Sequence, residues 1–264
     1  KATTDEFIII ADDQSNVIAL HRDTAEIKWR INTGIVPASG PTVNQDRIII
    51  ASASGDILAL NATDGTEVWR THVAAEILAD PAIDQNMTII KTMDGKVYAF
   101  DSKNGEQLWQ YHHGPARISL RASSAPVIAD NVVVVGFEDG KLDVLNLTNG
   151  QLVSQRTIAF PQGISLVDQV VGIVATPVVQ QGIIYVATYQ GRVSAIELAT
   201  GEDIWQQEMS VYTGMTLDGN VLYVSDANSH VWAIDKNDGQ VLWRQTQLNA
   251  RSITASVILD DFVV

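Results

Sequence analysis

A block of about forty residues recurs along this chain, and most copies close on a turn followed by a tryptophan. The copies that end on tryptophan are Ile18–Trp29, Leu58–Trp69, Tyr98–Trp109, Ser194–Trp205 and Trp232–Trp243. A degenerate copy runs from Asp143 to Ser154, with Ser154 in the place of the tryptophan. Repeats of this length, built from short β-segments and glycine turns, are typical of solenoids and propellers. Such folds serve as scaffolds for partners or as holders of a cofactor, and the functional question is which of the two applies.

One unit, residues 40–71, shows how the repeat predicts a four-stranded antiparallel blade. Pro41 suits the first residue of a strand, where it forfeits no ladder hydrogen bond. β-Branched and alternating apolar stretches then predict further strands, and glycine turns separate them. The expected later strands are Arg47–Ser52, Ile57–Asn61 and Glu67–Thr71, with turns at Ala53–Asp56 and Thr63–Gly65. The sequence therefore predicts an all-β propeller, and the tryptophan of each outer strand is expected to pack, largely buried, between neighbouring blades.

Counting units predicts a single propeller domain over residues 1–264 that is truncated at both ends. The first unit shows only the second to fourth strands, in 6–30, and the last shows a first strand and the start of a second, in 253–264. The complete units are expected at roughly 35–71, 76–111, 122–157, 175–207 and 211–245. The last strand could complete the first unit in a six-bladed ring. A larger ring with missing blades is favoured, since the chain stops inside a strand and an open apolar edge invites aggregation.

Composition removes several classes of function. The net charge of −14 argues against electrostatic binding to nucleic acid or anionic lipid. The chain has no cysteine, so disulfides, thiolate zinc sites and cysteine nucleophiles are excluded from these residues. No apolar run approaches the length of about 20 residues that a membrane-spanning helix needs.

Two adjacent connectors between blades are longer than the others. The distance from each tryptophan position to the proline that opens the next blade is 12 residues twice, 29 to 41 and 69 to 81. It grows to 17 from Trp109 to Pro126 and to 23 from Ser154 to Pro177. Antiparallel geometry places both connectors on the same face as the turns between second and third strands. Long loops are often functional, so this face is the candidate site.

The long connectors carry apolar residues that admit two interpretations. The residues are Ile118, Leu120, Ile164, Leu166, Val167, Val170, Val171 and Ile173. They could form an exposed partner-binding patch, with Arg121 as a charged anchor. They could equally fold back onto the blades as additional core. A metal site at His112 and His113 is disfavoured, because adjacent side chains on an extended segment point in opposite directions. No nucleophile triad or metal-binding motif appears in the sequence, so an enzyme would need a bound cofactor.

The sequence motif from Ala99 to Trp109, repeated from Ala233 to Trp243, resembles the tryptophan-docking repeat of quinoprotein (PQQ) dehydrogenase propellers. Across nearly the whole chain, the blade order, connector lengths and the segments Ile118–Pro126 and Ala175–Val179 are more similar to the BamB family. That resemblance implies an eight-bladed propeller lipoprotein of the outer-membrane β-barrel assembly (BAM) complex. It also implies a place on the periplasmic face of a Gram-negative outer membrane, reached through an N-terminal lipid anchor that is expected to be absent from these residues.

The same resemblance implies partners and partner-binding residues. The expected partner is the set of periplasmic POTRA domains of BamA, with unfolded outer-membrane proteins as a further candidate. The family's Leu-x-Leu-Arg segment corresponds to Ile118, Leu120 and Arg121. Its Asp-x-Asp segment falls on Gly172 and Val174, so both carboxylates are absent here. We therefore expect the second connector to contribute apolar contact instead of charge.

Three functions remain open at this stage. The leading one is a non-enzymatic assembly scaffold without a cofactor. The alternative is a fragment of a quinoprotein-type dehydrogenase, which the missing cysteines and the lack of an evident carboxylate–amide cluster disfavour. The third is an extracytoplasmic propeller with an unidentified protein partner.

Overall fold

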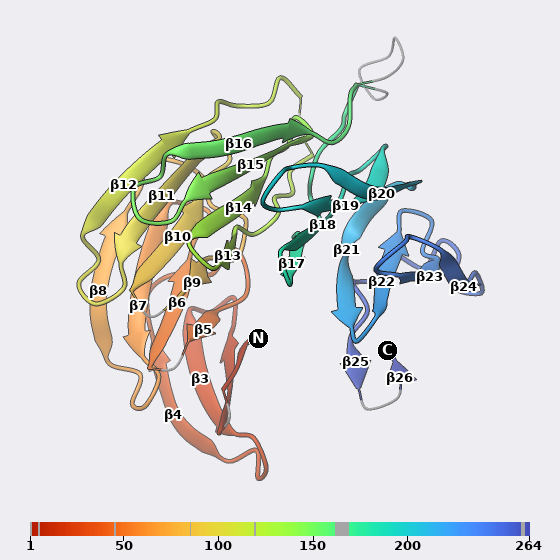
Figure 1. Cartoon of the computed structure of the whole chain (residues 1–264). Coiled ribbons are helices and arrows are strands. Elements are labelled where there is room, and N and C mark those ends of the chain that lie inside the picture. The colour runs from red at the N-terminus through yellow and green to blue at the C-terminus, as the bar shows by residue number, and fades with distance from the viewer. Residues whose placement is uncertain are drawn as a thin grey trace. The chain divides into compact units, whose positions relative to one another are not determined.

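The computed structural model describes residues 2–4, 6–44, 46–84, 86–118, 120–161, 169–259 and 262–264. These residues contain β-strands and no helix, in six four-stranded antiparallel sheets and one two-stranded sheet (Figure 1). In every four-stranded sheet the strands lie side by side in chain order. None of the described segments forms a helix that is long and apolar enough to cross a membrane.

The chain divides into two compact units, Lys1–Pro115 with Leu147–Gln151, and Ala116–Asn146 with Leu152–Val264. The prediction of one domain over 1–264 stays a prediction. The first three sheets belong to the first unit. The first sheet holds β1 (Ala2–Thr3), β2 (Phe7–Ala11), β3 (Asn16–His21) and β4 (Ile27–Asn32). The second holds β5 (Thr42–Asn44), β6 (Arg47–Ala51), β7 (Asp56–Asn61) and β8 (Glu67–His72), and the third holds β9 (Ala82–Ile83), β10 (Met87–Lys91), β11 (Lys96–Asp101) and β12 (Gln107–His112).

The strands of the other three four-stranded sheets lie in the second unit, and the turn Leu147–Gln151 in the fourth sheet groups with the first unit. The fourth sheet holds β13 (Val127–Ala129), β14 (Val132–Gly136), β15 (Lys141–Asn146) and β16 (Leu152–Thr157). The fifth holds β17 (Val178–Gln180), β18 (Ile183–Ala187), β19 (Arg192–Glu197) and β20 (Asp203–Glu208). The sixth holds β21 (Val211–Asp218), β22 (Val221–Asp226), β23 (Val231–Asp235) and β24 (Val241–Gln245), and β25 (Ile258–Leu259) pairs with β26 (Phe262–Val263).

The prediction for the first unit was incomplete. Residues Ala2–Thr3 form a first strand that pairs antiparallel with β2, so this unit has four strands and not three. Two residues are too short to carry a strand signal of their own, and the strand exists through its pairing with Ile8 and Ile9. The five units that were expected to be complete all form four-stranded sheets.

The core lies between sheets, and the second and third strands supply most of it. In the second sheet, Ile48 and Ile50 pack with residues of the first sheet, whereas Ile49 and Ala51 pack with residues of the third. Successive side chains of a strand point to opposite faces, so a strand covered on both sides must be apolar throughout. Each fully buried aliphatic side chain contributes about 1.5–3 kcal/mol to stability. Fourth strands are mostly exposed, and in β8 only Trp69 is buried.

The tryptophans join consecutive sheets through one repeated contact, which we call the tryptophan–turn contact. The indole lies against a glycine in the turn between the third and fourth strands of the next sheet, and its N–H donates to a carbonyl three residues before that glycine. The acceptors for Trp29, Trp69, Trp109 and Trp205 are the carbonyls of Ala62, Ser102, Leu147 and Lys236, at 2.8–3.2 Å. Gly65, Gly105, Gly150 and Gly239 lie directly beneath the four rings.

The tryptophans that make the tryptophan–turn contact are buried or half-buried, and the outer-strand tryptophan that does not make it is exposed. Trp69, Trp109 and Trp205 are buried and Trp29 is half-buried, as the repeat predicted. The same prediction was wrong for Trp243, which is 42% exposed. The strands that follow it, β25 and β26, place no equivalent glycine turn over the indole.

Candidate partner-binding surface

The two long connectors converge on the end of β14 within the second unit. The Ser124 hydroxyl of the first connector donates to the carbonyl of Gly136 at 3.2 Å. The second connector reaches the same place, because the Ile173 N–H donates to the carbonyl of Phe137 at 3.0 Å. A third bond joins the connectors directly, from the Ala125 N–H to the Thr176 hydroxyl at 3.1 Å. The structure therefore brings the two connectors together, at the same end of the sheet as the turn between β14 and β15.

Close packing at Gly136 fixes the second connector. A Cβ atom at this residue would overlap the side chain of Ile173, whose own Cβ lies 2.7 Å from the position it would take. Ile173 is fully buried and packs with Val134, Ile158 and residues of the fifth sheet. Gly172 forms an isolated antiparallel bridge with Tyr189, and the Tyr189 N–H donates to its carbonyl at 2.8 Å. The connector segment around Ile173 is therefore part of the core between the fourth and fifth sheets.

The structure separates the five predicted site residues into two groups. Arg121 is exposed, and Ile118 and Leu120 are half-buried, so all three are accessible to solvent. Gly172 is buried and Val174 is only 9% exposed, so these two lie beneath the surface. Whether any of the five contacts a partner stays a prediction.

The alternative interpretation, additional core, holds for part of the second connector. Val171 and Ile173 are buried, because the chain folds back over Gly136 and Gly140. Val170 is half-buried. Ile164, Leu166 and Val167 lie outside the described residues. Among the described residues of the two connectors, the predicted site residues that are accessible lie in the first connector.

Sequence reasoning missed the turn Phe137–Gly140, on which both connectors rest. Ser123 donates to the Glu138 carboxylate at 2.9 Å, and both Phe137 and Glu138 are buried. The equivalent turns begin with a residue whose side-chain oxygen closes the turn, such as Ser52 or Thr188. Phe137 stands where those turns have a residue with a side-chain oxygen. This difference in the sequence could have identified the turn as unusual.

The sequence disfavoured a metal site at His112 and His113. Among the described residues, no group of three or more His, Asp or Glu side chains is placed to hold a metal ion. His112 is exposed and His113 half-buried. The expectation that the protein uses no cofactor stays a prediction.

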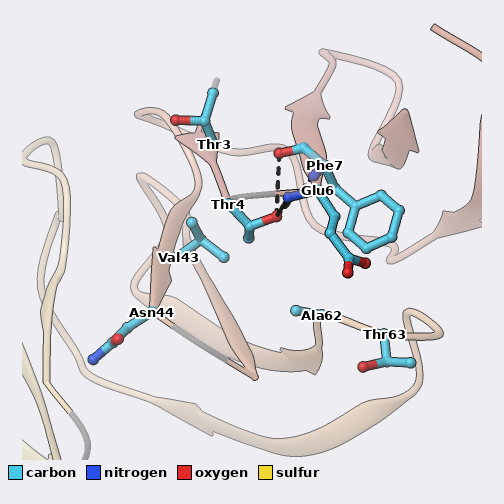
Figure 2. Close-up of a pocket in the computed structure, with 8 residues that line it drawn as sticks. All are labelled: Thr3, Thr4, Glu6, Phe7, Val43, Asn44, Ala62 and Thr63. Atoms are coloured by element: carbon cyan, nitrogen blue, oxygen red, sulfur yellow. Dashed lines mark hydrogen bonds between the residues drawn. The ribbon is translucent and has the colours of Figure 1, made fainter. Parts of the chain in front are cut away.

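A cavity of about 410 Å³ lies between the first and second sheets (Figure 2). Its lining includes Thr4, Glu6 and Phe7 from the first sheet and Ala62 and Thr63 from the turn under Trp29. The Thr4 hydroxyl accepts the Phe7 N–H at 2.8 Å and so closes a turn, as the dashed lines in Figure 2 show. Glu6 is the one ionisable side chain among the described lining residues, so the cavity brings together no catalytic set.

The repeated four-stranded sheets and their tryptophan–turn contacts define a β-propeller protein of the PQQ-repeat type. The chain resembles the crystal structure of BamB from Moraxella catarrhalis with a TM-score of 0.92 and 25% identity, over 99% of this chain and 80% of that one. A quinohemoprotein alcohol dehydrogenase from Pseudomonas putida HK5 also matches, with a TM-score of 0.72, 12% identity, and coverage of 92% of this chain and 60% of that one. At that identity the likeness shows the fold alone.

The family described as outer membrane protein assembly factor BamB matches residues 4–245. The chain therefore belongs to the BamB family, which confirms both the resemblance and the propeller fold. The BamB of Legionella pneumophila (strain Paris) is 43% identical over 147 residues, which are 56% of this chain and 38% of that protein. The chain thus aligns with well under half the length of this relative. Its curated relatives are named as outer membrane protein assembly factors.

Proposed function

We propose that this protein is a non-enzymatic scaffold of outer-membrane protein assembly that binds the periplasmic POTRA domains of BamA. The family match over residues 4–245 carries the proposal. The scaffold acts on the periplasmic side of the outer membrane of a Gram-negative bacterium, held there by an N-terminal lipid. It assists the folding and insertion of β-barrel proteins and also offers surfaces to their unfolded chains.

The binding surface in this proposal is the exposed part of the first connector, with Ile118, Leu120 and Arg121 at its centre. Two half-buried apolar side chains beside an exposed guanidinium combine area for burial with a group that pairs with a carboxylate. The bonds to Gly136 and Thr176 hold the end of this connector in place before binding, which lowers the entropy lost on association. Gly172 and Val174 are buried in the second connector and lie outside this exposed centre.

Titration of POTRA domains against single variants tests the proposal. Arg121→Ala should weaken binding by about 1–4 kcal/mol if the guanidinium becomes desolvated in the complex. Leu120→Ala should weaken binding as well, through lost apolar burial. Arg117→Ala is the matched control, because this arginine is exposed in the same connector and lies outside the proposed centre. Thermal unfolding of each variant confirms that the sheets remain folded.

Unchanged affinity in both Arg121→Ala and Leu120→Ala would remove this surface as the binding site. An equal loss in Arg117→Ala and Arg121→Ala, abolished by salt, would show only general charge attraction. No POTRA binding by any form of the folded protein would contradict the proposed function itself.

A further inference from the structure

The contact between the fourth and fifth sheets differs from the other tryptophan–turn contacts. In the repeat, a small residue of the third strand faces the tryptophan, as Ala195 faces Trp205. Here Val144 faces Ser154, and Ser154 is exposed. The two extra carbon atoms of a valine over an alanine replace only a small part of an indole. The position that an indole occupies between other sheets is therefore open.

The turn that would receive the indole keeps the geometry of the others. Gly201 has φ of 73°, against 75° for Gly239 beneath Trp205. The Leu198 N–H donates to the Gly182 carbonyl at 2.8 Å, as the Lys236 N–H donates to Asn220 at 3.0 Å. The Leu198 carbonyl thus has the place in its turn of the carbonyl that accepts the Trp205 indole.

No side chain of the described residues covers Gly201. A Cβ atom on Gly239 would lie 2.7 Å from the Trp205 ring, whereas one on Gly201 would meet no atom within 4 Å. A cavity of about 600 Å³ occupies this region, between sheets that both belong to the second unit. Its apolar lining is Val132, Val144, Val153, Ile183, Leu198, Ala199 and Ile204. Val153 and Ile204 are 60% and 45% exposed, so the cavity opens to solvent.

The charge at this cavity indicates what would enter it. Asp130 and Glu197 line the cavity, and its described lining residues include no lysine or arginine. Both carboxylates are exposed, so they would attract a cation without being desolvated first. An aromatic side chain therefore fits the apolar lining of the cavity, and a basic neighbour fits the carboxylates of Asp130 and Glu197 at its rim.

We propose that the cavity between the fourth and fifth sheets binds a tryptophan side chain of another polypeptide, carried beside a lysine or arginine. The indole lies against Gly201, packs on Val144 and Ile204, and donates its N–H to the Leu198 carbonyl. The basic neighbour pairs with Asp130 or Glu197. This site is separate from the surface proposed for POTRA domains and does not rest on that function.

The test uses the full chain and two short capped peptides, Gly-Lys-Trp-Lys-Gly and Gly-Lys-Ala-Lys-Gly. Methyl NMR should show shifts at Val153, Leu198 and Ile204 on titration with the tryptophan peptide. The alanine peptide should produce none at the same concentration, on the order of 1 mM, where a single anchor side chain is expected to bind.

A variant that fills the cavity with a tryptophan of this chain itself tests the proposal most directly. Ser154→Trp should occupy the cavity, raise the unfolding temperature and reduce peptide affinity by at least about tenfold, because the indole position is taken. The double variant V144A/S154W restores the alanine–tryptophan pair of the other sheets. It replaces the single variant in the experiment if the indole of Ser154→Trp has too little room beside Val144. Gln110→Trp is the control, since it adds an indole at an exposed position of an outer strand away from the cavity.

The rim is tested without altering the cavity. The double variant D130N/E197Q keeps the shape and the oxygen acceptors, and should weaken binding by about threefold to tenfold with a smaller salt dependence. Equal binding of the two peptides, or full binding by a folded V144A/S154W variant, would overturn the proposal. Self-association of the chain that Ser154→Trp abolishes would assign the cavity to a second copy and overturn it too.

Discussion

At the scale of single residues, Asp226 organises the turn between β22 and β23. It is 6% exposed, and one carboxylate oxygen accepts the backbone N–H groups of Asn228 and His230 at 2.9 and 2.8 Å. The other oxygen contacts the His230 ring and accepts the Trp232 indole N–H, both at 2.9 Å. Burial by itself raises the pKa of Asp226, but the hydrogen bonds from Trp232 and His230 outweigh it and lower the pKa below 3.8.

This lowered pKa predicts a pH-dependent contribution to stability. The ionised Asp226 stabilises the fold above the unfolded pKa of 3.8, and that contribution is lost as pH falls through the lower folded pKa. Asp226→Asn should therefore cost about 1–3 kcal/mol near neutral pH, because a charge-assisted set of hydrogen bonds is weakened. Urea unfolding at neutral pH and at about pH 2.5 measures the difference, which should shrink in acid.

Asp23→Asn is the control for this experiment, because Asp23 is an exposed turn residue. It should change stability little at either pH. A loss in Asp226→Asn that is as large in acid as at neutral pH would show that the ionised state of Asp226 does not contribute.

At the scale of elements, the turn between third and fourth strands joins a sheet to the one before it wherever a tryptophan covers the glycine of that turn. The turn needs a glycine for two reasons, which are the positive φ and the close approach of the indole. In this chain the two reasons can be tested apart, because one such glycine has the positive φ without the indole. Gly239 and Gly201 have the same φ, yet only Gly239 lies under a tryptophan. The pair therefore measures what the tryptophan–turn contact contributes.

We expect Gly201→Ala to cost about 1–2 kcal/mol, the strain of an L-residue at positive φ. Gly239→Ala should cost about 1–3 kcal/mol more, since its methyl group would lie 2.7 Å from the Trp205 ring and force the indole to move. Denaturant unfolding of both variants gives the difference, and tryptophan fluorescence should shift only in the second. Equal losses in the two variants would mean that this contact contributes little.

At the scale of the whole molecule, the same fold serves assembly factors and dehydrogenases, so the fold does not decide between them. What decides is the family match over residues 4–245 and the residues placed on the scaffold. The described part of the chain gathers no set of three metal-binding side chains. The exposed features on which the proposals rest are an arginine beside apolar side chains and an open apolar cavity.

We therefore expect no dehydrogenase turnover when the folded protein is incubated with PQQ and calcium. A dye-linked assay with alcohol and aldehyde substrates measures this, and a quinohemoprotein dehydrogenase treated in the same way is the positive control. Turnover by this chain, or saturable binding of PQQ followed by absorbance, would reverse the functional assignment.

The repeat alone determined the class of fold, the strands of five units and the glycine turns. It did so because the signals are local: β-branched runs, turn residues and one tryptophan position recur every forty residues or so. The convergence of the two long connectors also followed from counting residues, since antiparallel strands place alternate connections at opposite ends of a sheet. Ile118, Leu120 and Arg121 lie in the first of these connectors, and their role in binding a partner stays a prediction.

Only the tertiary structure decided what depends on a distant neighbour. Ala2–Thr3 become a strand through pairing with β2, and Trp243 stays exposed because β25 and β26 place no glycine turn over it. Ile173 is core and not surface because Gly136, far away in the sequence, leaves room for it. An apolar residue in a loop has the same sequence signal whether it folds inward or faces a partner. Burial depends on what packs against the residue, and that is a property of the folded chain.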